Sequence, residues 1–394
     1  MEDGTCILTG EQTLIVRQKM PMMVKGVPNT QSSGAALTSF DKAAYQSHGW
    51  DGTKNATIGY DSSVIAHQAL DILLRDDNHH YRSGGTVFVF WGLQDCEGLN
   101  PKLWSDPAAV TTKEIFTVPT LLSSLPGKQA QKRKFYLASL KGNKGRIALS
   151  SWSSRDREEI KTNVKRFIES QQCAPGVKAK PIWALRNCAF RDPVKEHTDK
   201  VTTALIHATL FGAALPDNYA LLVCDRICAE QDVLKTYDRA QALAFYLASN
   251  DSTIMEKLSN LPTPVSPTSE QIAFILGRIA FLMHMAQVRA QNLPREETNV
   301  SRSLRTFSTT PALMFPRLYY GCIAHHLVDR DGKNLGYIRN SLDEEFGKFG
   351  ACFNPASDLP KNFNAKEQSC FFLGWGIRRA EFFQKKDKKD NQEE

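Results

Sequence analysis

Short apolar runs separated by polar loops characterise the first half of the chain. Residues 86–91 (TVFVFW), 134–140 and 146–152 are apolar runs of strand length. The last two runs are joined by residues 141–145 (KGNKG), and two glycines in so short a connection predict a β-hairpin. A helix is expected from about Arg155 to Gln171, with Ser153 or Ser154 as its N-cap.

From about Ala184 onward, apolar residues recur with the period of an α-helix. Asn364 and Glu367 predict a capping box at the start of the last of these helices. Three prolines in residues 261–267 (LPTPVSP) cannot continue a helix, so they mark a linker. The periodicity predicts helices over residues 197–212, 218–230, 237–249, 270–291, 312–327, 337–347 and 365–385.

These patterns predict an α+β protein, with a mixed strand-and-loop N-terminal half followed by an all-helical half that ends in a helical bundle. At roughly 150 residues per domain, 394 residues are expected to form two or three domains. The expected parts are a mixed α/β domain at 1–183 with a Gly/Ser loop and a basic hairpin, a helical middle region at 184–262, a C-terminal helical bundle at 263–386 and a disordered tail at 387–394.

The composition is that of a soluble globular protein, with 42% hydrophobic and 23% charged residues. No uninterrupted apolar run reaches the roughly 18 residues of a membrane span. The acidic start of the chain lacks the basic region of a secretory signal, and the nine cysteines are scattered without a disulfide-like framework. A cytoplasmic protein with reduced thiols is therefore expected.

The sequence motifs of the common catalytic chemistries were not found. The chain has no G-x-x-x-x-G-K-S/T phosphate loop, no G-x-G-x-x-G after a strand, no H-E-x-x-H and no G-x-S-x-G. We therefore expect no catalytic residues and no cofactor, although an enzyme with a convergent acid/base pair remains an alternative.

One cysteine pair has a spacing that a metal site could use. Cys224 and Cys228 are four positions apart, and two adjacent-histidine pairs, His79-His80 and His325-His326, are possible distant partners. Zinc sites usually show two close Cys or His pairs, so buried structural thiols are favoured and no metal is expected. For His325 and His326, packing or capping roles are favoured.

Positive charge is concentrated in residues 126–180, which hold fourteen basic and four acidic residues, whereas the formal net charge of the chain is +7. Such a segment is typical of a phosphate-binding surface, but a solvated hairpin and helix face would have the same composition. Phe135, Tyr136 or Trp152 could stack on unpaired bases if exposed, although strand alternation places most of them in a core. The residues expected to bind phosphates are Lys128, Lys132, Arg133, Lys134, Lys141, Lys144 and Arg146.

Residues 25–35 (KGVPNTQSSGA), the Gly/Ser loop, form a second candidate binding element. Glycine, proline, asparagine and paired serines predict a tight polar turn whose amides could meet a phosphate or a base edge. A plain structural turn is the alternative reading. The residues of this loop expected to bind nucleic acid are Lys25, Asn29, Gln31, Ser32 and Ser33.

The same loop belongs to a series of motifs that resembles the large subunit of the type I-C CRISPR surveillance complex, Cascade. The motifs follow in the family's order over nearly all 394 residues. The family's large subunits usually have an extra N-terminal domain before the first motif, so a shortened member lacking that domain is expected. The matching segments include 6–11 (CILTGE), 25–27 (KGV), 31–35 (QSSGA), 135–147 (FYLASLKGNKGRI), 310–312 (TPA) and 367–368 (EQ).

The resemblance implies a non-catalytic subunit of an RNA-guided antiviral ribonucleoprotein. Such a subunit would bind target DNA and the 5′ end region of the guide RNA, help R-loop formation and dock a helicase-nuclease. The implied partners are crRNA, target double-stranded DNA, Cascade backbone subunits, a small subunit and the helicase-nuclease effector. The alternative is a truncated mobile-element homologue that works with a transposase or nuclease partner, or that inhibits a host Cascade.

The resemblance also bears on the C-terminal bundle. In the family this bundle resembles the small subunit, which internal initiation can produce, and Met255 is positioned to start a product covering residues 255–394. Arginines of the bundle, expected to be exposed, would line the displaced DNA strand. A solvated helix face is the alternative for all of them, and an ion pair between helices is a further alternative for Arg278. The arginines are Arg278, Arg289, Arg302 and Arg305.

Overall fold

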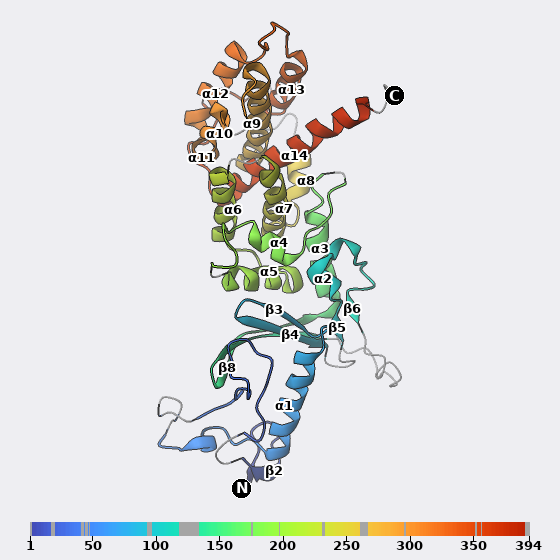
Figure 1. The fold of residues 1–394 in the computed structure, drawn as a ribbon, viewed down its shortest axis with the longest axis vertical. Helices are drawn as coiled ribbons and strands as arrows, with labels where there is room; N and C mark the ends of the chain where they lie inside the picture. Colours follow the sequence, from blue (N-terminus) through green and yellow to red (C-terminus); the bar gives the residue numbers. More distant parts are fainter. Residues whose placement is uncertain are drawn as a thin grey trace. The chain divides into compact units, whose positions relative to one another are not determined.

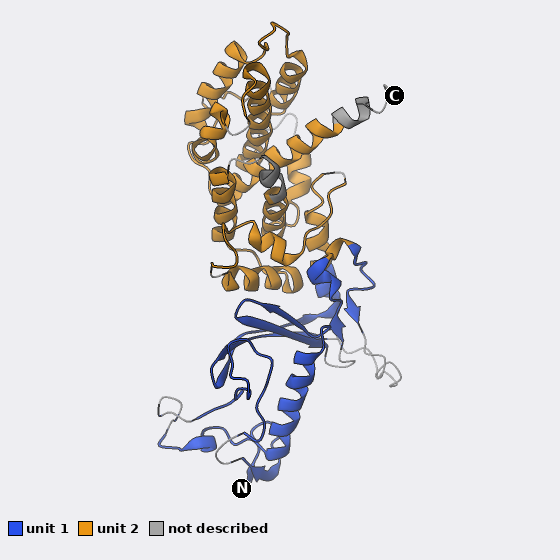
Figure 2. Ribbon diagram, viewed as in Figure 1, with its two compact units in different colours: residues 1–105, 109–162 blue, residues 106–108, 163–394 orange. Residues whose placement is uncertain are grey.

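The computed structural model divides into two compact units, which Figure 2 colours separately. Unit 1 comprises residues 1–105 and 109–162, and unit 2 comprises residues 106–108 and 163–394. Within them the structure describes residues 2–16, 20–40, 43, 46, 48–92, 97–117, 134–174, 176–196, 198–230, 233–260, 267–294, 297–350, 353–355 and 357–390. The strands lie in the first half and helices predominate in the second, which confirms the predicted fold class (Figure 1). The division into three domains and a tail stays a prediction.

The centre of unit 1 is a four-stranded antiparallel sheet with strand order β3-β4-β7-β8. Its strands are β3 (His80–Ser83), β4 (Thr86–Gly92), β7 (Lys134–Asn143) and β8 (Arg146–Asp156). Two small ribbons accompany it, β1 (Glu2–Thr5) with β2 (Gln12–Ile15), and β5 (Gly98–Leu99) with β6 (Phe116–Thr117). The helices α1 (Tyr60–Arg75) and α2 (Lys102–Ser105) also belong to this unit, and α3 (Arg157–Ser170) begins in it.

The predicted hairpin is confirmed as β7 and β8, but both strands are longer than expected and only Lys144 and Gly145 connect them. β8 continues to Asp156 because this residue pairs with Lys134. The helix α3 therefore starts at Arg157, and a carboxylate oxygen of Asp156 accepts the N–H of Glu158 at 3.0 Å. The prediction that Ser153 or Ser154 caps this helix is wrong, because both serines lie within the strand.

One face of the sheet packs against the loop that precedes α1 and against α1 itself. The side chains of Val87 and Val89 are fully buried there. Burying a side chain of this size stabilises the fold by about 2 kcal/mol. The same apolar cluster fixes the position of the loop, because it contains residues of the loop, of α1 and of the sheet. Its members are Val24, Val27, Ala35, Leu74, Val87, Val89, Leu140 and Ile147.

The opposite face of the sheet is covered by aromatic packing from α2 and β6. Phe90 and Phe135 are fully buried, and the ring of Phe116 meets that of Phe135 edge-on at 5.2 Å between centroids. The ring of Trp104 stacks on Tyr81 at 4.8 Å. Phe135 is therefore a core residue, but Tyr136 is half-buried and Trp152 is exposed, so the expectation that most of these three rings lie in a core is wrong.

Unit 2 contains helices throughout its described part. All seven helices predicted for the second half are present, with small differences at their ends. The last one continues past Lys385 to Asp390 and so overlaps the expected tail; residues 391–394 lie outside the described residues. The helices are α4 (Ile182–Asn187), α5 (Asp199–Phe211), α6 (Asp217–Glu230), α7 (Val233–Asn250), α8 (Ile254–Ser259), α9 (Ser269–Gln291), α10 (Asn299–Arg302), α11 (Leu304–Thr309), α12 (Pro311–His325), α13 (Gly336–Gly347) and α14 (Ala365–Asp390).

The helices α9 and α14 form the centre of unit 2. A Cβ atom at Gly277 would lie 1.8 Å from the carbonyl oxygen of Phe371, and one at Gly374 would lie 2.1 Å from that of Phe274. The two helices therefore approach at backbone contact through one glycine each, and α14 also packs on α6 and α7. α9 is long and apolar enough to cross a membrane, but 94% of its most apolar 18-residue stretch is buried within the structure, as in the core helix of a soluble protein.

The predicted capping box at the start of α14 is confirmed. The N–H of Glu367 donates to the side-chain oxygen of Asn364 at 3.0 Å, and the Glu367 carboxylate accepts the N–H of Asn364 at 2.7 Å. These two bonds satisfy donors that a helix N-terminus otherwise leaves unpaired. The helix that positions the core of unit 2 thus begins where the sequence predicted.

Candidate nucleic-acid interface

The Gly/Ser loop and the tip of the β7–β8 hairpin, which the sequence places more than a hundred positions apart, are joined by backbone hydrogen bonds. The N–H of Lys144 donates to the carbonyl oxygen of Asn29 at 3.0 Å, and the N–H of Gln31 donates back to that of Lys144 at 3.0 Å. On the other side of the tip, the N–H of Ala36 donates to the carbonyl oxygen of Gly145 at 2.9 Å, and the N–H of Ile147 donates to the carbonyl oxygen of Ala36 at 3.0 Å. The two candidate elements therefore form one structure.

A close backbone approach makes this junction possible. A Cβ atom at Gly142 would lie 2.2 Å from the carbonyl oxygen of Pro28 and 2.5 Å from the methyl carbon of Thr30. No real Cβ atom tolerates such distances, so the hairpin accepts the loop only because this position has no side chain. The hydroxyl of Thr30 also donates to the carbonyl oxygen of Val27 at 2.7 Å, which shapes the turn from within.

The loop is anchored by its apolar residues and presents its polar ones. Val24 and Ala35 exchange N–H to carbonyl hydrogen bonds at 3.0 and 2.9 Å and are fully buried, so they close the base of the loop. The N–H of Gly34 donates to Gln31 at 2.9 Å, which closes a turn over the paired serines. The side chains predicted to bind nucleic acid are all exposed, namely Lys25, Asn29, Gln31, Ser32 and Ser33.

The charged residues of the junction are all basic. Segments 25–36 and 134–147 together contain five lysines and arginines and no aspartate or glutamate. Lys25, Lys134 and Lys144 are exposed, and Lys141 and Arg146 are half-buried. The other predicted phosphate-binding residues, Lys128, Lys132 and Arg133, lie outside the described residues.

Arg82, which the sequence analysis did not single out, holds the loop to α1 by hydrogen bonds to the backbone of both. Its guanidinium donates to the carbonyl oxygen of Leu74 in α1 at 2.9 Å, and to that of Gly26 at 3.4 Å. It also contacts the ring nitrogen of His80, whose other nitrogen lies 2.9 Å from the carbonyl oxygen of Asp76. An arginine in a short polar strand gives no sequence signal for this role.

This arrangement offers three kinds of group that nucleic acids bind. Exposed cations attract phosphates, exposed amide and hydroxyl groups form hydrogen bonds with phosphates or base edges, and the buried anchors hold both at fixed positions. Among the described residues, no group of three or more His, Cys, Asp or Glu side chains could hold a metal ion. The geometry therefore favours an anion-binding surface.

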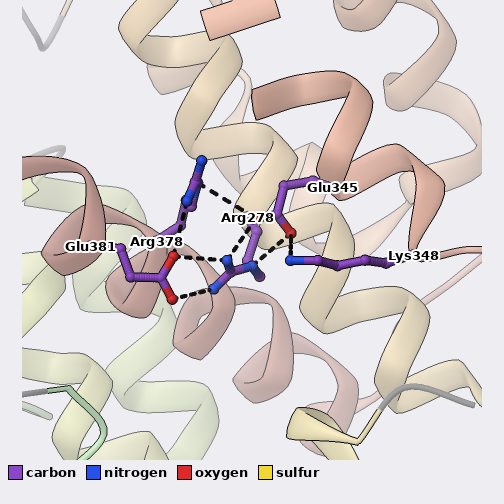
Figure 3. A network of polar contacts seen from close by, with 5 residues as sticks. All are labelled: Arg278, Glu345, Lys348, Arg378 and Glu381. Carbon is purple, nitrogen blue, oxygen red and sulfur yellow. Dashed lines mark hydrogen bonds and ion pairs between the residues drawn. The ribbon is translucent and has the colours of Figure 1, made fainter. Parts of the chain in front are cut away.

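Arg278 does not lie on an exposed face of unit 2, which corrects the expectation that it lines a displaced strand. Its side chain is buried, and its guanidinium donates to the Glu345 carboxylate at 2.6 and 2.7 Å and to the Glu381 carboxylate at 2.8 and 3.1 Å. Figure 3 shows it between these two carboxylates, with Lys348 on Glu345 and Arg378 on Glu381. The alternative of an ion pair between helices is confirmed.

The network shifts the acidity of its carboxylates. Burial alone would raise the pKa of Glu345, but hydrogen bonds and charge from Arg278 and Lys348 outweigh it and lower the pKa. The pKa of Glu381 is lowered in the same way, because Arg278 and Arg378 offset the effect of burial. Both groups are therefore held as carboxylates, and the network joins α9, α13 and α14.

The other three arginines predicted for the displaced strand are exposed. Arg289 lies near the end of α9, Arg302 ends α10, and Arg305 lies in α11. Arg305 forms an exposed ion pair of 2.9 Å with Asp225 of α6. Their role in binding DNA stays a prediction.

Among the described residues, the candidate metal-ligating side chains do not gather into a group that could hold a metal ion. Cys224 is buried and Cys228 is half-buried, and burial raises the pKa of both thiols, that of Cys228 to about 11. His79 is buried with one ring nitrogen 3.0 Å from the carbonyl oxygen of Phe90. His326 follows α12 as its C-terminal cap and is buried, and burial lowers its pKa, as expected for a packing or capping residue. His325, the last residue of the helix, is exposed, so the packing role predicted for both histidines holds for His326 only.

The chain was compared with families of known proteins and with curated proteins. A family model described as CRISPR-associated protein (Cas_Csd1) matches residues 1–383. A search of curated proteins found no match. The family match covers both units and includes the Gly/Ser loop, the hairpin and the helical core.

Proposed function

Because the chain belongs to the CRISPR-associated Csd1 family, the large subunits of type I-C Cascade, we propose that it binds nucleic acid as a non-catalytic part of such a complex. In RNA-guided complexes of this kind, base pairing with the guide reads the sequence, and protein subunits hold the strands through shape and backbone charge. The proposed ligands are target double-stranded DNA and the 5′ end region of the crRNA.

The observation that carries this proposal is the junction between the loop and the hairpin. Its five cations come from two distant segments without a single carboxylate, and backbone hydrogen bonds fix the segments to each other. A hairpin face that only contacts solvent would not need the Gly/Ser loop packed against it. Nor would it need the buried residues Val24 and Ala35 that anchor the loop, or a glycine at position 142 that lets the loop approach. We assign Lys25, Lys144 and their neighbours at this junction to phosphate contacts.

The proposed partners follow from the family. They are the Cascade backbone subunits, a small subunit and a helicase-nuclease that would supply the catalysis, all in the cytoplasm. Helping R-loop formation and docking the helicase-nuclease are parts of the same proposal. The apolar helix α9 is consistent with a protein outside the membrane, because it is buried in unit 2.

Affinity purification from the native host tests this function. Guide-length RNAs with a shared repeat-derived 5′ end, together with co-purifying backbone subunits, are the expected result. Recovery of the protein alone, or with subunits of a foreign complex and no guide, would contradict it. Either of these contradicting results would favour the alternative of a mobile-element homologue or an inhibitor.

We also propose that Met255 starts an internal small-subunit product covering residues 255–394. Met255 lies in α8, and the product would retain the central contact between α9 and α14. It would lose α6 and α7, on which α14 also packs, so it would need another partner for that face. A Met255→Leu variant should abolish the short species in mass spectrometry, and its persistence would refute the assignment.

A further inference from the structure

Three aromatic side chains gather on one face of the central sheet of unit 1. Trp91 comes from β4, Tyr136 from β7 and Trp152 from β8. The ring centroids are 5.6 Å apart for Trp91 and Tyr136, 5.4 Å for Trp91 and Trp152, and 5.8 Å for Tyr136 and Trp152. Each ring thus contacts the other two, and together they span three adjacent strands of the sheet.

The register of the sheet explains this cluster. Trp91 lies directly opposite Tyr136, and Trp152 lies opposite the small residue Ala138. The three rings share the face of Val87 and Val89, because side chains alternate along a strand. Farther along the strands the same face is covered by the Gly/Ser loop and α1.

The cluster is open to solvent at the edge of the sheet. Trp152 is 54% exposed, and Leu149, which precedes it on β8, is 56% exposed. Tyr136 and Trp91 are partly exposed. Tryptophan side chains are highly buried on average, so an exposed one that is held by two other rings is typical of a binding surface.

The charge around the cluster favours a nucleic acid as its ligand. Lys134 is exposed and precedes Tyr136 by two positions, which places it on the same face. The hairpin strands and their turn, residues 134–156, contain five basic residues and one acidic residue. The basic tip at Arg146 lies about 20 Å along β8 from Trp152, a short path for a nucleic-acid strand.

We propose that Trp152, Tyr136 and Trp91 form a stacking platform for the unpaired bases of a single-stranded nucleic acid. The basic residues of the hairpin would hold its phosphates. Aromatic rings of this kind stack on any base, because every base has a π-face. This inference rests on the proposed nucleic-acid binding and adds to it a site where unpaired bases stack.

The test compares two oligonucleotides that differ only in their bases. Full-length protein, with the subunits that co-purify, is titrated with oligothymidylate and with an abasic oligomer of the same length. The Trp152→Ala variant should bind oligothymidylate about 5- to 140-fold more weakly, since alanine substitution removes about 1–3 kcal/mol of stacking per base and each 1.4 kcal/mol is a factor of ten. It should bind the abasic oligomer as well as the wild type does. Its salt dependence should be unchanged, because no phosphate contact is lost.

Two further variants make the result specific. Trp152→Phe keeps an aromatic ring and should restore most of the affinity. Trp183→Ala removes a tryptophan of α4 that is 46% exposed and should leave both affinities unchanged. Running the titrations with DNA and with RNA oligomers distinguishes a displaced DNA strand from the guide RNA as the source of the bases.

The outcomes separate this inference from the proposed function. Equal binding of oligothymidylate by wild type and Trp152→Ala, with duplex DNA still bound through Lys144, would overturn the platform alone. Equal binding of both oligomers by the wild type would overturn it as well. Failure to bind any nucleic acid at low salt would overturn both.

Discussion

The backbone N–H of Lys144 donates to the carbonyl oxygen of Asn29 at 3.0 Å, and both residues have a positive φ, 52° and 61°. Residues other than glycine adopt this conformation rarely, and it persists where surrounding structure holds it. Here each residue lies at the turn of its own segment, and the hydrogen bond locks one turn to the other. The two segments therefore present their exposed side chains as a single surface.

The absence of a side chain at Gly142 should be necessary for this surface. We expect Gly142→Val to destabilise unit 1 by about 1–3 kcal/mol, because its side chain would overlap the backbone at Pro28 and force the loop away. Thermal or denaturant unfolding measures the change. Gly145→Ala is the matched control, since a Cβ at Gly145 would meet nothing within 4 Å. Equal stability of the two variants would mean that the loop does not pack on the hairpin.

A second pair of glycines tests the core of unit 2. Gly277→Ala should destabilise this unit by about 1–3 kcal/mol, because the new methyl group would lie 1.8 Å from the carbonyl oxygen of Phe371. Gly321→Ala in α12 meets nothing within 4 Å and should stabilise it by about 0.5–1 kcal/mol. Denaturant titrations compare the two. The account of the α9–α14 crossing fails if both changes have the same sign.

Removing Arg278 should be costly because it leaves the buried carboxylate of Glu345 and the half-buried one of Glu381 with fewer partners. Arg278→Met is expected to lower the free energy of unfolding by about 3–5 kcal/mol. The matched control, Arg289→Met, removes an exposed arginine of the same helix and should change stability by less than about 0.5 kcal/mol. A loss of DNA binding without a loss of stability in Arg278→Met would contradict its assignment as a structural residue.

The same network should make stability depend on pH in the acidic range. The pKa values of Glu345 and Glu381 are lowered from 4.5 in the folded protein, so their contribution is present above that pH and is lost as pH falls through the folded values. We expect the melting temperature to fall below about pH 4.5. In Glu345→Gln this fall should be smaller, from a lower starting stability at pH 7. Identical pH profiles for variant and wild type would show that Glu345 titrates normally.

Much of the fold follows from local sequence patterns. The helices of unit 2 were predicted by their periodicity, and the capping box of Asn364 and Glu367 located the start of α14. The hairpin was predicted from its glycine-containing turn. The helix cap at Ser153 or Ser154 was wrong, because pairing of Asp156 with Lys134 extends β8, and strand pairing between distant residues is not visible in a local pattern.

The candidate site was predicted in part. The polar loop residues and the hairpin lysines stood out by their composition and charge, but nothing in the sequence indicates that Asn29 and Lys144 meet. Arg278 was placed on the surface because charge normally lies there, whereas its partners Glu345 and Glu381 come from two other helices. Arg82 and Trp91 were missed for the same reason, since their roles depend on contacts between segments.

The salt dependence of duplex DNA binding tests the central claim most directly. Lys25→Glu and Lys144→Glu change one exposed cation on each side of the junction. Each should weaken binding to all sequences alike and reduce the slope of log affinity against log salt by about 1, and the double variant by about 2. Lys333→Glu with Lys361→Glu makes the same charge change at exposed positions of unit 2 and should leave the slope unchanged. Affinity and slope equal to those of the wild type in the Lys25 and Lys144 variants would contradict the claim that the loop and the hairpin form one nucleic-acid interface.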